Sequence, residues 1–275
     1  MNFGRGIAPL LFLCYNQIKP SHLISRKEVN IMISHYDLEY KKDLYVDLHL
    51  PESDGFDLFV YFHGGGLTGG SRKKIEPMAE GLAKINVATA SVEYRMYPHA
   101  KFPDFIEDGA CAVRWLKDHI SEWGRCNRIF VGGSSAGGYI SMMLCFDDSY
   151  FKAVGLVPTD IDAYIHDAGQ PTSHFNVLKE LGKDSRRLIV DETAPMYFVG
   201  TAEKYSPMLF IVSDGDLPCR YEQTLLMVRV LKHFGHEKNV LLHVQHGKHC
   251  EYVCKRDENG NEILSGIISD FLKRL

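Results

Sequence analysis

The stretch that decides the fold spans residues 128 to 138 and reads Arg128-Ile129-Phe130-Val131-Gly132-Gly133-Ser134-Ser135-Ala136-Gly137-Gly138. Its first half is an apolar run of the kind that forms a strand buried on both faces, and a helical apolar pattern follows it. The Gly-x-Ser-x-Gly between them is typical of a sharp strand-to-helix turn that presents a nucleophilic serine. Only Ser135 has glycine two positions before and two positions after it, so Ser135 is the predicted nucleophile rather than Ser134.

A second glycine-rich motif, His63-Gly64-Gly65-Gly66, directly follows the apolar run at residues 58–62. Loops of this kind supply backbone N–H groups that bind an oxyanion in lipases and esterases. We therefore predict that the N–H groups of Gly65, Gly66 and Ala136 form an oxyanion hole. A nucleotide-binding loop has little support, because the motif lacks a Gly-Lys-Ser/Thr ending.

A serine nucleophile needs a histidine base, and the base needs a carboxylate to orient it. Where a strand-to-helix turn carries the serine, the acid and the histidine follow it in that order along the chain. Asp216 is the predicted acid, and Asp214 remains its rival because Asp before Gly is commonly a turn residue. His249 is the predicted base, while His246 and His243 are interpreted as structural.

The segment around the base, His246-x-x-His249-Cys250-x-x-x-Cys254, also invites a zinc interpretation. Its spacing matches no common zinc site, and a zinc ion on His249 would leave the serine without a base. We expect no metal ion and no organic cofactor.

Apolar runs alternate with helical patterns from residue 35 onward, which predicts an α/β fold with a mostly parallel sheet flanked by helices. The expected helices include residues 104–120 and 262–275. The expected strands are residues 35–40, 44–50, 58–62, 87–92, 128–131, 153–157, 208–212 and 240–244.

Two segments depart from this alternation. Residues 158–207 have no long apolar period and are interpreted as an insertion that forms a small lid over the substrate pocket. Residues 1–34 are interpreted as a poorly ordered extension before a single domain at 35–275, with either Met1 or Met32 as the natural start. The apolar residues 7–15 resemble a secretion signal poorly, because no cleavage site follows them.

Composition limits the function classes further. With 31 basic and 35 acidic residues spread along 275 positions, no basic surface is expected to attract nucleic acid or anionic membranes. Seven cysteines without a disulfide spacing favour reduced thiols and a cytoplasmic location. The expected partner is a small-molecule substrate, and a homo-oligomer stays open.

Together these motifs resemble the branch of the α/β hydrolases that includes bacterial short-chain carboxylesterases and acetyl esterases. The resemblance extends to Tyr94-Arg95-Met96-Tyr97-Pro98 and to Phe102-Pro103, which leads to Asp108. Ser134 departs from the family pattern, since many relatives carry an acidic residue at that position. The resemblance implies a serine hydrolase that cleaves a short-acyl, acetyl-like ester through an acyl-enzyme. Two alternatives remain: an amide hydrolase such as a formamidase or a small-peptide hydrolase, and a non-catalytic binding protein of the same fold.

Overall fold

The computed structural model describes residues 32–275. Residues 1–31 of the expected N-terminal extension lie outside the described residues, and so do the candidate secretion signal, Cys14 and the first of the two candidate start positions. The first strand begins at Met32, which pairs with Pro51, so regular structure starts three residues earlier than the expected boundary at His35.

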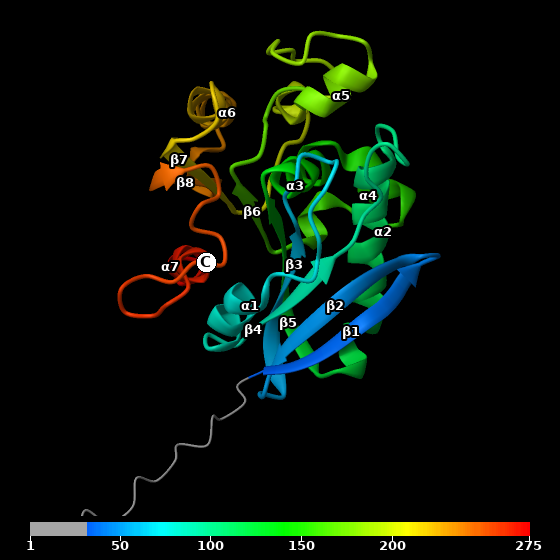
Figure 1. The fold of residues 1–275 in the computed structure, drawn as a ribbon, viewed down its shortest axis with the longest axis vertical. Helices are drawn as coiled ribbons and strands as arrows, with labels where there is room; N and C mark the ends of the chain where they lie inside the picture. Colours follow the sequence, from blue (N-terminus) through cyan, green and yellow to red (C-terminus); the bar gives the residue numbers. More distant parts are fainter. Residues whose placement is uncertain (1–31) are drawn as a thin grey trace, which may run out of the picture. The chain divides into compact units, whose positions relative to one another are not determined.

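A single eight-stranded sheet forms the centre of the molecule, with the strand order β1-β2-β4-β3-β5-β6-β7-β8 (Figure 1). The pairs β1–β2 and β2–β4 are antiparallel, and all other neighbours are parallel. The predicted α/β architecture with a mostly parallel sheet is confirmed. The strands are β1 (Met32–Lys41), β2 (Leu44–Pro51), β3 (Gly55–Phe62), β4 (Val87–Val92), β5 (Arg125–Ser134), β6 (Ala163–Asp167), β7 (Met208–Gly215) and β8 (Val240–Lys248).

Helices cover both faces of the sheet, because the parallel connections require crossovers (Figure 1). One apolar core includes side chains of α2, α3 and α6, and the other includes side chains of α1 and α7. The helices are α1 (Glu76–Ala83), α2 (Asp104–His119), α3 (Ala136–Phe146), α4 (Asp148–Ala153), α5 (Phe175–Glu180), α6 (Arg220–His233) and α7 (Ile263–Leu272). Short 3-10 turns lie at Ile120–Glu122, Pro158–Asp160, Pro195–Phe198 and Glu237–Asn239.

Strand β3 shows how the sequence supplies both cores. Its side chains alternate, so Leu58 and Val60 enter the first core while Phe59 and Tyr61 enter the second. A continuous apolar run is therefore what a central strand with two covered faces requires.

The prediction of a strand at residues 153–157 is wrong. Ala153 ends helix α4, and Gly155, with a φ of 72°, terminates that helix in a left-handed conformation. The strand that pairs with β5 is instead β6, which lies inside the segment interpreted as an insertion. Sequence patterning does not predict β6, because His166 and Asp167 interrupt its apolar run. Both residues are nevertheless buried and hydrogen-bonded.

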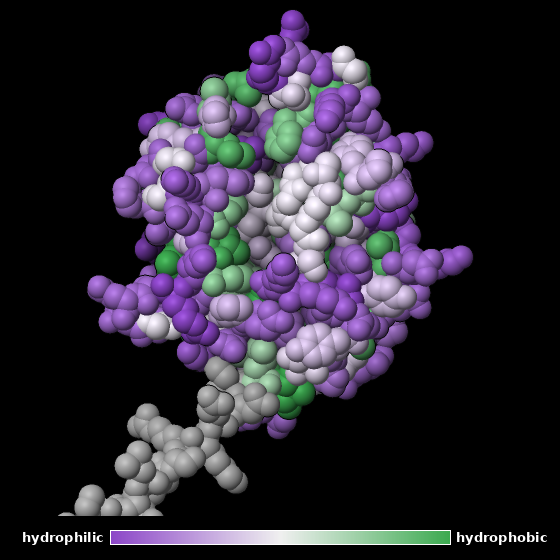
Figure 2. All heavy atoms as spheres, in the orientation of Figure 1, coloured by the Kyte–Doolittle hydropathy of each residue, from purple (hydrophilic) through white to green (hydrophobic). Residues whose placement is uncertain are grey.

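Hydrophilic residues dominate the face of the molecule drawn in Figure 2, and hydrophobic residues form small separate patches on it. Within residues 32–275, no helix combines the length and the apolar character needed to cross a bilayer. Nor do histidine, cysteine and acidic side chains of the described chain gather in a group that could hold a metal ion.

Candidate active site

Four loops that carry the predicted site residues meet at one edge of the sheet. They follow the carboxyl ends of β3, β5, β7 and β8, which run parallel to one another. Parallel strands present their carboxyl ends at the same edge, so residues far apart in the sequence come together there.

The turn between β5 and α3, residues 133–137, is called the elbow below. Its central residue Ser135 has φ 55° and ψ −110°, a conformation that L-residues rarely adopt. The N–H group of Ser135 donates a 2.8 Å hydrogen bond to the carbonyl of Asp167, which holds this backbone in place. Side chains at Gly133 and Gly137 would lie 2.4 Å and 1.8 Å from the carbonyl oxygen of Phe62, so only glycine fits at both positions.

The three predicted catalytic side chains form one hydrogen-bonded chain. The Ser135 Oγ lies 2.8 Å from His249 Nε2, and His249 Nδ1 lies 2.5 Å from Asp216 Oδ1. The Asp216 carboxylate is fully shielded from solvent, whereas the His249 side chain is 20% exposed. Asp216 also accepts hydrogen bonds from the N–H groups of Ser213 and Leu217.

Those contacts determine the ionisation of the acid. Burial alone raises the pKa of Asp216, but the hydrogen bond and the charge of His249, together with the two backbone N–H groups, outweigh it. The net pKa of Asp216 therefore lies below its ordinary value, and the carboxylate is ionised at neutral pH.

The rival residues form a separate pair at the surface. His246 Nδ1 lies 2.8 Å from Asp214 Oδ2, and the two side chains are 95% and 48% exposed. Their hydrogen bond raises the pKa of His246 and lowers that of Asp214. His243 contacts Gln245 on β8, so neither alternative histidine reaches Ser135.

The glycine loop after β3 lies beside the elbow. Gly64 approaches Ser135 so closely that an added Cβ would lie 3.4 Å from the Cβ of Ser135, and Gly65 and Gly66 have φ values of 127° and 65°. The carbonyl of Gly65 accepts from the N–H groups of Thr68 and Gly69. These bonds turn the loop back on itself beside the start of α3, where the N–H of Ala136 lies.

His63, the first residue of the motif, supports this loop. Its ring stacks on Tyr94 with centroids 4.5 Å apart, and its Nδ1 contacts the carbonyl of Gly64. Burial lowers the pKa of His63, which favours a neutral ring in this position.

Arg95 and Asp108, from the other motifs of the resemblance, make a structural contact with each other. The fully buried Asp108 carboxylate pairs with the guanidinium of Arg95 and the ammonium of Lys41. The bidentate contact between Arg95 and Asp108 fixes the chain that follows β4. Two residues after Arg95, the N–H of Tyr97 donates to the carbonyl of Leu67.

The open pocket at the nucleophile has a volume of about 430 Å³. Phe175 of α5 contributes to its wall, and the next residue, Asn176, donates a hydrogen bond to the carbonyl of Gly66. Sequence reasoning assigned no role to either residue, because nothing local connects α5 to the glycine loop. The pocket is lined by Tyr61, Gly64, Gly65, Gly66, Ser134, Ser135, Phe175, Leu217, His249, Cys250 and Val253.

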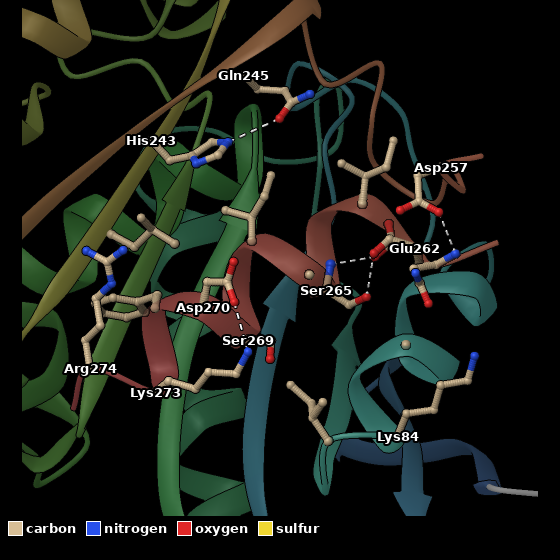
Figure 3. A pocket seen from close by; sticks show the side chains of 18 of the residues that line it. Lys84, His243, Gln245, Asp257, Glu262, Ser265, Ser269, Asp270, Lys273 and Arg274 are labelled. Carbon is tan, nitrogen blue, oxygen red and sulfur yellow. Dashed lines mark hydrogen bonds and ion pairs between the residues drawn. The ribbon is translucent and has the colours of Figure 1, made fainter. Parts of the chain in front are cut away.

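Another depression, of about 660 Å³, lies beside α7 and β8 (Figure 3). Its polar groups pair with one another: the N–H of Ser265 donates to the Glu262 carboxylate, and the Lys273 ammonium donates to Asp270. None of these pairs joins a nucleophile to a histidine, unlike the contact between Ser135 and His249.

Comparison with known proteins agrees with this fold. A family model described as an alpha/beta hydrolase fold matches residues 59–189. The crystal structure of Esterase B from Lactobacillus rhamnosis matches 89% of this chain and 86% of its own, with a TM-score of 0.72 and 17% identity. The chain has the α/β hydrolase fold.

Several curated proteins similar to this chain are carboxylesterases, which confirms the expected resemblance to that branch. Carboxylesterase NlhH of Mycobacterium tuberculosis is 37% identical over 93 residues, or 33% of this chain and 29% of that protein. Probable carboxylesterase 6 of Arabidopsis thaliana is 36% identical over 111 residues, or 37% of this chain and 33% of that protein. The alignments thus span about a third or less of the length of either relative.

Proposed function

We propose that this α/β hydrolase is a serine carboxylester hydrolase that cleaves small, short-acyl esters through an acyl-enzyme. The observation that carries the proposal is the continuous contact from Ser135 through His249 to the buried Asp216. The similarity to carboxylesterases supports the ester as the substrate class.

In the proposed mechanism His249 Nε2 removes the proton of Ser135 as its Oγ attacks the ester carbonyl carbon. The negative charge that develops on the carbonyl oxygen is stabilised by the N–H groups of Gly65, Gly66 and Ala136, and each such donor lowers the barrier by about 3 kcal/mol. His249 then gives the proton to the departing alcohol, and the acyl group stays on Ser135. His249 then deprotonates a water molecule that attacks the acyl carbon, the bond between this carbon and the Ser135 Oγ breaks to release the acid, and His249 returns the proton to the Oγ. Asp216 stabilises the imidazolium in both steps.

Short acyl groups are proposed because the apolar side chains of Phe175, Leu217 and Val253 line the pocket at Ser135. Phe175 belongs to the segment predicted to form a lid, and we propose that α5 limits the length of the acyl chain. The thiols of all six cysteines among residues 32–275 are free, which supports a reducing, cytoplasmic compartment. A small-molecule ester, rather than nucleic acid or membrane, is the proposed partner.

A fluorophosphonate probe tests the nucleophile. We expect the probe to label the wild-type protein at Ser135, to label Ser134→Ala at the same residue, and to fail on Ser135→Ala. Hydrolysis of p-nitrophenyl acetate should fall on the order of 10⁴-fold or more in Ser135→Ala. Labelling of another residue, or an active Ser135→Ala protein, would refute the proposal.

Comparison of substrates tests the reaction class. Turnover of p-nitrophenyl acetate should exceed that of p-nitrophenyl octanoate and of p-nitroacetanilide. A preference for the anilide or for an N-formyl substrate would instead identify an amide hydrolase. A preference for the octanoate would overturn the short-acyl assignment.

A further inference from the structure

Beneath the elbow lies a buried polar network that the catalytic steps above do not use. At its centre is Asp167, the last residue of β6, which is 1% exposed. Ser134 donates a 2.5 Å hydrogen bond to Asp167 Oδ2, and the Tyr252 hydroxyl donates to Oδ1. The Tyr61 hydroxyl of β3 in turn donates to the Ser134 Oγ at 3.0 Å.

This network joins the two segments that carry the nucleophile and the base. Ser134 is the residue before Ser135 in the elbow. Tyr252 belongs to the turn at residues 249–254, called the histidine turn here, which begins with His249. The backbone carbonyl of Asp167 also accepts the N–H of Ser135, so Asp167 contacts the elbow through both its main chain and its side chain.

Each hydrogen bond of the network has a defined direction. Tyr61 donates to Ser134, while Ser134 and Tyr252 both donate to Asp167, so both carboxylate oxygens must act as acceptors. An ionised carboxylate is the side chain that accepts at both oxygens. A buried charge lowers stability unless such hydrogen bonds compensate it. A buried carboxylate at this position therefore points to a function.

We infer that Asp167 is a positioning residue: its carboxylate ties the elbow to the histidine turn and so fixes the distance between the Ser135 hydroxyl and the His249 ring. The inference rests on the proposed function, since it concerns the alignment of that nucleophile with that base. Because a misplacement of about 1 Å can cost about a hundredfold in rate, loss of the tie should slow catalysis while the fold persists.

The charged and titratable groups around Asp167 agree with this role. Burial raises the pKa of Asp167 to about 6, and the hydrogen bonds from Ser134 and Tyr252 oppose the rise. The charge of His249 lowers the pKa of Asp167, and the charge of Asp216 raises it. The other titratable groups near Asp167 have pKa values that burial raises; they are the phenols of Tyr61 and Tyr252 and the thiol of Cys250. Above pH 7 the carboxylate is therefore ionised and accepts both bonds.

The test removes the tie one bond at a time. Tyr252→Phe deletes only the hydroxyl, and Asp167→Asn places an N–H₂ group where one hydroxyl needs an acceptor. We expect each variant to lower kcat for p-nitrophenyl acetate and the rate of fluorophosphonate labelling together, by about tenfold or more, with KM little changed. Because the two residues form one tie, kcat of the double variant should be no lower than kcat of the less active single variant.

The matched control is Tyr164→Phe on β6. Tyr164 lies three positions before Asp167 on the same strand, and its buried hydroxyl donates to the carbonyl of Pro158. Loss of this hydroxyl should leave kcat and the labelling rate at wild-type values. Wild-type rates in folded Tyr252→Phe would overturn the inference, as would an equal loss in the control. Full activity of Ser135→Ala would instead refute the proposed function, so the two failures are distinguishable.

Discussion

At the scale of single residues, burial separates two aspartates that sequence reasoning could not separate fully. Asp214 and Asp216 each contact a histidine, but Asp214 is half exposed while Asp216 is shielded and accepts from His249. An exposed ion pair contributes little, because water screens it. A shielded carboxylate, in contrast, fixes the tautomer of the base and stabilises its charged form.

Substitution of the two aspartates tests this difference. Asp216→Asn should lower kcat on the order of 10⁴-fold, because an amide holds His249 in the wrong tautomer. Asp214→Asn is the matched control and should change kcat by no more than about threefold, as befits a screened surface pair. Steady-state kinetics with p-nitrophenyl acetate measure both, and a larger loss in Asp214→Asn would transfer the acid role to that residue.

At the scale of elements, the contact between the start of α3 and the end of β3 brings the elbow beside the glycine loop. Gly137 lies so near the carbonyl oxygen of Phe62 that backbone would meet any added side chain there. Gly266 of α7 offers the opposite case, since nothing lies within 4 Å of the position that its Cβ would take.

The same substitution in these two helices should therefore have opposite effects. Gly137→Ala should destabilise the protein by about 3 kcal/mol or prevent folding, because the backbone must shift to admit the methyl group. Gly266→Ala should stabilise it by about 0.5–1 kcal/mol, since alanine loses less entropy than glycine in a helix. Urea unfolding gives both values, and a stable Gly137→Ala protein would contradict the close approach described above.

At the scale of the whole molecule, the buried charge of Asp167 links global stability to pH. Its pKa rises from 3.8 to about 6 in the folded state, so between these values the folded protein retains a proton that the unfolded chain has lost. A raised pKa contributes stability that is fully present below about pH 4 and is lost as the pH rises through 6.

This linkage is measurable against Asp167→Asn, which cannot titrate at that position. From pH 4 to pH 7 the free energy of unfolding of the wild type should fall relative to that of the variant by about 2 kcal/mol, which is most of the effect of the pKa shift. Urea unfolding of both proteins across this range supplies the difference. Parallel stability curves would show that Asp167 titrates normally and that its burial has no such cost.

The sequence alone determined the fold class and most of the strands. Local sterics explain this success: an elbow needs glycine around Ser135, and a strand with two covered faces needs a continuous apolar run, as at residues 58–62. Strand β6 escaped prediction because His166 and Asp167 are polar in sequence yet are buried through partners elsewhere in the chain.

Only the tertiary structure decided which groups of the site touch. It brought Asp216 rather than Asp214 to His249, and it joined Ser134 to Asp167 across 33 residues of sequence. Neither contact follows from spacing, because both depend on which strand ends lie side by side at the edge of the sheet. The motifs thus specify the types of chemical group available, while the packing of the strands selects their partners.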